Sequence, residues 1–211
     1  MPRTADHDAR RRQVAEAMLR VTMTEGLEAA SIPRIAREAG VSTGLVQRYF
    51  PTKDDLLRYA FRYVLDELFT AIDAELAASA GRRIGTRLYR ALAILLAPVE
   101  SPGDPAGRVW LAFLARAAVH EGLRELHVEL NQQGRRQYAD ALRAAQAAGD
   151  AAADLDPERE ARALMAYVDG LTLHLVLEPE TMTPVRARAE LHRYLSRLVR
   201  IEDEPPTEGD R

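Results

Sequence analysis

Two short helix-forming segments separated by a Gly-Val-Ser turn constrain this sequence more than any other feature. In SIPRIAREAGVSTGLVQRYFP, residues 31–51, each segment follows a serine suited to cap a helix. Gly40 suits the left-handed backbone that closes the first segment, and Pro51 stops the second. Two such helices, packed on a preceding helix, form a helix-turn-helix unit.

The rest of the chain also predicts helices. Ala, Leu, Arg and Glu dominate its 211 residues, and no stretch shows sustained alternation of β-branched residues, so the predicted fold class is all-α. The fourth helix opens with the capping box Thr52-x-x-Asp55 and is long enough to lead from a small domain into a larger one. Helices are predicted at about residues 8–25, 32–39, 43–49, 53–80, 83–97, 108–120, 121–148, 157–177 and 185–201.

Composition argues against several classes of protein. The chain has no cysteine, so disulfides and thiolate metal sites are excluded, and its five histidines show no HExxH pattern. The apolar runs are too short to span a bilayer, and the polar N-terminus lacks the apolar core of a signal peptide. Neither a glycine-rich phosphate loop nor a nucleophile elbow appears. We therefore expect a cytoplasmic protein with no metal, no cofactor and no membrane partner.

The charge is distributed unevenly. The net charge is −3, yet residues 1–60 carry ten Lys or Arg against eight Asp or Glu, a local charge of +2. Phosphate contacts depend on local charge, so the N-terminal region remains a candidate for nucleic-acid binding. Arg10, Arg11 and Arg12, ahead of the first helix, suit a nucleic-acid backbone or minor groove, although a charge run is more often a solvated face.

The third predicted helix carries side chains suited to reading DNA. Gln47 and Arg48 have donors that match the edges of adenine and guanine, and Thr43 can add a methyl contact. Gly44 weakens a helix, which suggests that another backbone approaches it closely, the alternative being a poorly formed turn. Tyr49 can offer its hydroxyl to a phosphate. Lys53, the only lysine in the chain, suits a phosphate as a compact point charge, or is a solvated surface residue.

At these residues the sequence resembles the DNA-binding domain of the TetR family of transcriptional regulators. That family shows the pattern IA-x-x-AGVS-x-G-x-x-Y-x-(H/Y)-F-x-(S/T/N)-K-(D/E)-x-L. Gln47 departs from it by replacing the first tyrosine, which leaves the operator preference open. The matching residues are Ile35, Ala36, Ala39, Gly40, Val41, Ser42, Gly44, Tyr49, Phe50, Lys53, Asp54 and Leu56.

The resemblance implies a ligand-responsive regulator, most simply a repressor that binds a palindromic double-stranded DNA operator as a homodimer and is released by a small-molecule effector. Residues 1–52 would form the helix-turn-helix domain with an N-terminal arm, residues 53–201 the effector-binding and dimerisation domain, and residues 202–211 a disordered acidic tail. The predicted DNA-binding residues are Ser31, Arg34, Ser42, Thr43, Gly44, Gln47, Arg48, Tyr49 and Lys53.

The last two helices are the expected dimer interface, because the family pairs them in a four-helix bundle. Ala163, Ala166 and Gly170 would permit close approach, and the alternative for the leucine stripes is core packing within one subunit. The candidate interface residues are Leu164, Val168, Leu171, Leu175, Leu191, Leu195 and Leu198.

The middle helices are expected to hold an effector pocket. This part resembles the C-terminal domain of the branch that contains the repressor of choline-to-betaine synthesis, and aromatic rings with Asp169 would suit a cation. A Trp and a Phe at helical spacing are otherwise core residues. The pocket candidates are Trp110, Phe113, Tyr138, Tyr167, Asp169 and His174.

Two other readings stay open at this point. One is an all-α enzyme, for which His120 and His127 lie on one predicted helix face but lack a carboxylate at ligand spacing. The other is a helical dimer that has lost DNA binding, against which Gly44, Tyr49 and Lys53 argue.

Overall fold

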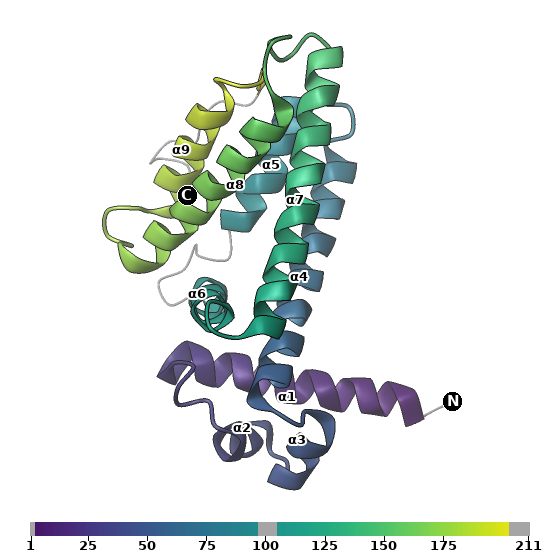
Figure 1. Cartoon of the computed structure of the whole chain (residues 1–211), viewed down its shortest axis with the longest axis vertical. Coiled ribbons are helices and arrows are strands. Elements are labelled where there is room, and N and C mark those ends of the chain that lie inside the picture. Colours follow the sequence, from purple (N-terminus) through teal and green to yellow (C-terminus); the bar gives the residue numbers. More distant parts are fainter. Residues whose placement is uncertain (1–2, 97–104, 203–211) are drawn as a thin grey trace. The chain divides into compact units, whose positions relative to one another are not determined.

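The computed structural model describes residues 3–96 and 105–202. Throughout these two ranges the regular structure is helical, which confirms the predicted all-α class (Figure 1). The helices are α1 Arg3–Glu25, α2 Ile32–Ala39, α3 Thr43–Tyr49, α4 Lys53–Ala78, α5 Ile84–Leu96, α6 Pro105–Ala117, α7 Glu121–Ala147, α8 Pro157–Leu177 and α9 Pro184–Leu195.

The chain divides into two compact units. The first contains residues 1–67 and 103–125, and the second contains residues 68–102 and 126–211. This division differs from the predicted boundary after residue 52, because the first part of α4 and all of α6 join the helix-turn-helix. The cause is apolar packing: Leu56, Leu57 and Phe61 of α4 are buried, and the Phe61 ring stacks on that of Phe113 in α6, with centroids 3.7 Å apart.

Helix α1 is the support of the first unit. It packs against α2 and α6, while α2 packs against α3 (Figure 1). It begins at Arg3 instead of near residue 8, because neither proline nor glycine interrupts the sequence between Pro2 and Gly26. Buried apolar residues from these helices share one core, among them Val14, Met18, Val21, Ile35, Val46 and Phe50.

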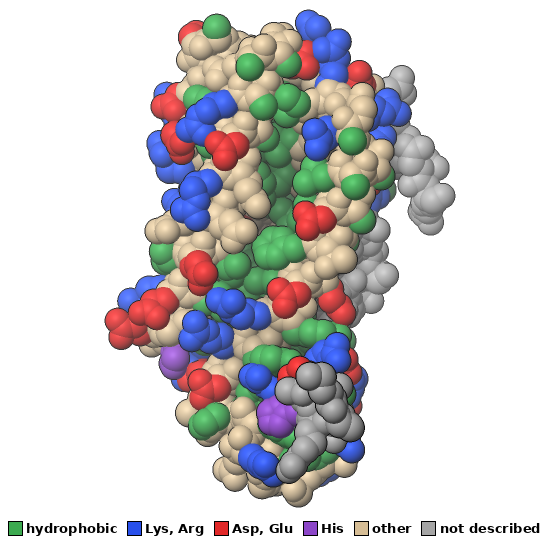
Figure 2. Space-filling model, turned by 90° about the vertical axis from the view of Figure 1, so that its right-hand side faces the viewer, with side chains coloured by type: hydrophobic (Ala, Val, Ile, Leu, Met, Phe, Trp, Pro, Cys, Tyr) green, Lys and Arg blue, Asp and Glu red, His purple; other side chains and the backbone are tan. Residues whose placement is uncertain are grey.

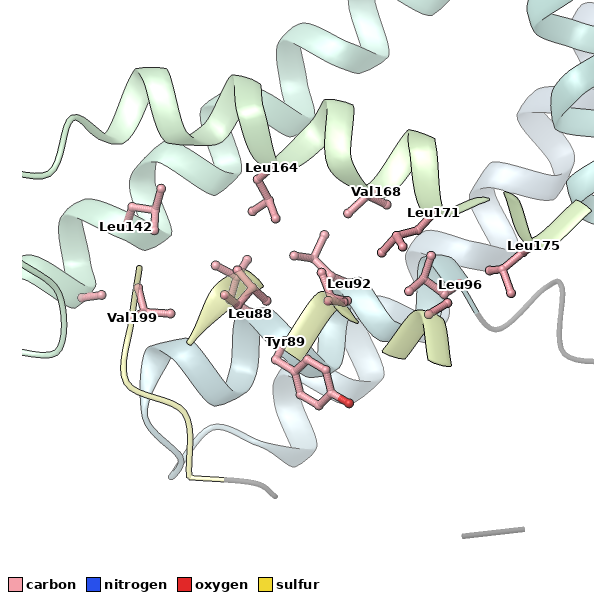
Figure 3. Packing of buried hydrophobic residues seen from close by; sticks show 14 residues of the cluster. Leu88, Tyr89, Leu92, Leu96, Leu142, Leu164, Val168, Leu171, Leu175 and Val199 are labelled. Carbon is pink, nitrogen blue, oxygen red and sulfur yellow. The ribbon is translucent and has the colours of Figure 1, made fainter. Parts of the chain in front are cut away.

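The core of the second unit lies where α5 contacts α8 and α9. Figure 3 shows leucines of α5 facing the leucine stripe of α8. This arrangement corrects the prediction for the dimer interface, since six of its seven candidates are buried inside their own subunit and Leu198 packs against the same cluster. The six buried residues are Leu164, Val168, Leu171, Leu175, Leu191 and Leu195.

The segment after α9 is a turn and a strap, whereas we predicted helix up to residue 201. The Arg200 N–H donates to the Asp150 carbonyl over 2.8 Å, and the Glu202 N–H donates to Thr86 Oγ1 over 2.9 Å. Glycine at position 85 lets this segment pack closely on α5, because a Cβ there would stand 2.3 Å from the Arg200 carbonyl oxygen. Glu202, assigned to the disordered tail, is thus held in place, and residues 203–211 lie outside the described residues.

Candidate nucleic-acid interface

Two serine caps and one glycine build the helix-turn-helix. Ser31 Oγ accepts the Arg34 N–H over 3.4 Å, and Ser42 Oγ accepts the Leu45 N–H over 3.2 Å. Gly40 has φ 66°, and its N–H bonds the carbonyls at the end of α2. Ser31 and Ser42, both predicted to bind DNA, therefore use their hydroxyls to cap α2 and α3. Their contribution is to set where α2 and α3 begin.

Helix α3 separates its inward and outward residues clearly. Val46 is buried and Phe50, which caps the helix, is buried as well. Thr43, Gly44, Gln47 and Arg48 are exposed, as their predicted role requires. A Cβ built on Gly44 would meet nothing within 4 Å, so packing inside the protein does not demand a glycine at that position.

Tyr49, at the end of α3, is half-buried beside a residue that the sequence analysis missed. The imidazole of His7 meets its ring edge-on, with centroids 4.5 Å apart and planes at 88°. His7 comes from the first turns of α1, which were expected to lie outside the helix. No local pattern could reveal this contact, because it joins residues 42 positions apart in the sequence.

Lys53 opens α4, as predicted, and its ammonium is already engaged. Lys53 Nζ donates to the Leu27 carbonyl in the connection between α1 and α2 over 2.5 Å. An ammonium has three N–H donors, so two remain for another acceptor. The capping box is confirmed: the Thr52 N–H donates to Asp55 Oδ2, and the Asp55 N–H donates to Thr52 Oγ1.

The Arg34 guanidinium is paired with two carboxylates, unlike that of Arg48. Its guanidinium donates to Glu25 over 2.6 Å and to Glu38 over 3.1 Å, and Arg20 also bonds Glu38. The hydrogen bond from Arg20, with that from Arg34, lowers the pKa of Glu38. Arg34 therefore ties α2 to α1. Arg37 and Arg48, in contrast, are exposed and form no ion pair with any residue that the structure describes.

The three arginines proposed for an N-terminal arm lie within α1. Arg11 packs over aromatic rings, 4.5 Å from the Tyr59 centroid and 5.4 Å from that of Phe50, so it holds α1 to α4 and to the end of α3. Arg10 donates to Gln13 Oε1, and Arg12 is exposed. The placement of these three residues ahead of the first helix is wrong, because α1 begins at Arg3, and their contact with DNA stays a prediction.

The effector-pocket candidates are divided between the two units, and a pocket built from them stays a prediction. Phe113 is fully buried in the first unit against Phe61, and Trp110 is half-buried on the same helix. Tyr167 stacks on Tyr194 of α9 with centroids 4.4 Å apart, and His174 is exposed beside Glu178. Phe113 and Tyr167 therefore pack on aromatic rings of their own units, and His174 lies at the surface.

Tyr138 of α7 and Asp169 of α8 are the two candidates that lie near each other. Burial raises the pKa of Tyr138, and the charge of Asp169 adds to that shift. Burial likewise raises the pKa of Asp169, while His127 opposes it. His127 Nε2 and Asn131 Nδ2 are 2.9 Å apart, which extends this polar cluster along α7.

The surface of the second unit is hollowed on one face. Figure 2 shows, in its upper part, a long depression whose floor is formed by hydrophobic side chains.

Within residues 3–96 and 105–202, no cluster of three or more His, Cys, Asp or Glu is placed to hold a metal ion. In the same ranges, no helix is both long and apolar enough to cross a membrane.

Comparison with known proteins assigns both parts of the chain. Residues 15–60 match the profile of bacterial regulatory proteins of the tetR family, and residues 86–200 match the profile of the C-terminal part of BetI-type transcriptional repressors. The regulator PksA of Bacillus subtilis is 31% identical, covering 99% of this chain and 98% of its own. The regulator BetI 2 of Chromohalobacter salexigens is 33% identical, covering 94% and 93%.

Solved structures agree. A transcriptional regulator from Rhodococcus sp. Rha1 has a TM-score of 0.77 at 28% identity, over 89% of this chain and 95% of its own. A regulator from Saccharomonospora viridis, crystallised with choline, has a TM-score of 0.79 at 24% identity, over 90% and 97%, and shows the fold. With a family profile covering more than half of its residues, this chain belongs to the TetR family of bacterial transcriptional regulators, DNA-binding proteins and not enzymes.

Proposed function

We propose that the chain binds a palindromic DNA operator as a homodimer, with α3 of each copy in the major groove. The observation that carries this proposal is the outward face of α3, where Gln47 and Arg48 are exposed while Val46 anchors the helix from behind. Gln47 suits adenine and Arg48 suits guanine as bidentate partners. Thr43 and Gly44 lie at the start of α3. Because Gly44 has no Cβ, the DNA backbone would have room to approach the helix there.

Tyr49 and Lys53 would hold the phosphate backbone beside α3. Lys53 keeps two N–H donors after its bond to Leu27, and Tyr49 is braced by His7. Ser31, Ser42 and Arg34 would act indirectly, because their polar atoms cap or tie the helices that present these contacts.

The dimer would form through the faces of α8 and α9 that point away from their own core. Leu177 is 64% exposed and Leu173 is 37% exposed, both on α8. Ala163, Ala166 and Gly170 lie along the same helix, and a Cβ on Gly170 would meet nothing within 4 Å. Small residues beside exposed leucines suit a close helix-to-helix contact between two copies.

The effector would be a small organic cation held in the second unit by Asp169 and Tyr138. The supports are the raised pKa values of the two half-buried groups and the profile match to BetI-type repressors, with the choline-bound regulator as a structural parallel. Binding would favour a state with different spacing of the two α3 helices and so release the operator, in the cytoplasm where the DNA lies. The ligand can shift this equilibrium only by its difference in affinity for the two states.

The test is a fluorescence-anisotropy titration of DNA flanking the protein's own gene, with random DNA of the same length as control, at several salt concentrations. We expect flanking DNA to bind at least about a thousandfold more tightly than random DNA. Lys53→Ala should weaken binding to both DNAs alike and reduce the salt slope by about one unit. Equal affinity for both DNAs at every salt concentration would contradict operator recognition.

A further inference from the structure

Asp54, in the first turn of α4, receives side chains from two other elements of the first unit. Arg116, in the last turn of α6, donates from Nε to Oδ1 over 2.8 Å and from Nη2 to Oδ2 over 2.7 Å. His120 Nε2 lies 3.3 Å from the same Oδ2. The paired bonds from Arg116 fix the direction of the carboxylate, because the planar guanidinium fits both oxygens at once.

His120 joins this carboxylate to the start of α7. Its Nδ1 accepts the N–H of Leu123, in the first turn of α7, over 3.4 Å. An Nδ1 that accepts leaves the proton of the neutral ring on Nε2, where it points to Asp54. One imidazole therefore connects the first turn of α4 to α7, which continues without a break to Ala147 and carries Tyr138.

Lys53 is the neighbour of Asp54, and its position depends on the same turn. The ammonium reaches the Leu27 carbonyl, and the charge of Glu28, the next residue in that connection, acts on Arg116. The connection between α1 and α2, the first turn of α4, the last turn of α6 and the cap of α7 thus meet at one place.

Stability does not by itself explain the paired geometry of this contact. The Arg116 side chain is 43% exposed and that of Asp54 is 18% exposed, so the ion pair contributes only modestly to the free energy of folding. What a bidentate pair does provide is a fixed orientation for the turn that bears it.

We propose that Arg116 and His120 are positioning residues for DNA binding: through Asp54 they fix the first turn of α4 and thereby hold Lys53 against the operator backbone. This inference rests on the proposed function, in which Lys53 contacts a phosphate. It makes α7, which reaches α4 through the contact between His120 and Asp54, a second link beside α4 itself between the effector residues and the DNA contact.

A double-mutant cycle tests whether Arg116 acts through Lys53. Operator affinity and salt slope are measured for the wild type, Arg116→Ala, Lys53→Ala and the double variant. We expect Arg116→Ala to weaken binding about fivefold in the wild-type background and less than about twofold once Lys53 is alanine, since the effects of coupled residues are not additive. The salt slope should fall with Arg116→Ala only while Lys53 is present.

The outcomes separate the two proposals. The same fivefold loss in both backgrounds, or no loss in either, would overturn the positioning role of Arg116 and leave operator binding intact. If Lys53→Ala itself changes neither affinity nor slope, the phosphate contact is wrong and the inference falls with it. Wild-type protein that does not distinguish operator from random DNA would instead reject the proposed function.

Further variants serve as a control, as a substitute for Arg116→Ala and as a test of His120. Arg143 is also an exposed arginine with carboxylate partners, Asp140 and Glu158, but it lies in the second unit, so Arg143→Ala should leave operator affinity unchanged. If Arg116→Ala melts early, Arg116→Gln keeps the stem of the side chain and is measured in its place. His120→Ala should also lose affinity only while Lys53 is present.

Discussion

At the scale of single residues, we expect the DNA partner, and not the fold, to require a glycine at position 44. The space around it is open, so Gly44→Ala should stabilise α3, raising the free energy of unfolding by up to about 1 kcal/mol. The same methyl group should obstruct the DNA backbone and weaken operator binding. Thermal melting and anisotropy on one sample would show the two opposite changes.

Gly134 provides the matched control, because a Cβ there would make ordinary contacts with Met165 at 3.5 Å inside the second unit. Gly134→Ala should leave operator affinity as it is. A Gly44→Ala protein with unchanged affinity would show that no backbone comes close to α3.

Asp169 should reveal a similar conflict between stability and effector binding. Its pKa is raised by burial, so the ionised carboxylate destabilises the fold at neutral pH. A raised folded-state pKa means that stability is full below the unfolded value of about 3.9 and is lost as pH rises through the folded value. Asp169→Asn should therefore raise Tm at pH 7, and the gain should vanish as pH falls toward about 4.

The same substitution should remove the response to a cationic effector. Choline is the probe, and an uncharged alcohol of the same shape is the control. Wild-type protein should release operator DNA when choline is added but not when the alcohol is added. The Asp169→Asn protein should keep its DNA in the presence of either compound. Release of the Asn variant by choline would place the cation elsewhere.

At the scale of elements, the ion pair between α6 and α4 predicts how the first unit responds to acid. The hydrogen bond from Arg116 lowers the pKa of Asp54 below its ordinary value. A lowered folded-state pKa gives stability that is present above the unfolded value and is lost as pH falls through the folded one. Asp54→Asn should therefore lower Tm at pH 7 and make no difference in strong acid, below both pKa values.

Differential scanning calorimetry across pH 2–7 checks this expectation. Asp140→Asn, which changes an exposed carboxylate on α7, is the control and should follow the wild type. A Tm difference that stays constant down to pH 2 would mean that the Asp54 charge plays no part.

At the scale of the whole molecule, dimerisation should depend on the outward face of α8. Leu173→Asp places a charge on that face and should shift the protein from dimer to monomer in sedimentation velocity. Operator affinity should fall with it, since one copy reads only one half-site. Val119→Asp alters an apolar residue that is 73% exposed in the first unit and should remain dimeric. If Leu173→Asp remains dimeric, or if Val119→Asp becomes monomeric as well, this face is excluded as the interface.

Local chemistry in the sequence determined the helix-turn-helix and the helical class. Ser31, Gly40, Ser42 and Pro51 act within a few residues of themselves, so their effects on capping and termination are readable from spacing alone. The exposed positions of α3 were predicted correctly for the same reason, because a helix with Val46 inward must point Gln47 and Arg48 outward.

The tertiary structure alone decided which apolar stripe is core and which polar groups meet. Leu164 and Leu171 lie on a stripe that periodicity cannot assign to a subunit core or to a dimer, and packing on α5 made them core. Asp54 meets Arg116 across 62 positions, and His7 meets Tyr49 across 42. Such contacts depend on how helices pack in space, and helical periodicity records only which face of a helix is buried, not what covers it.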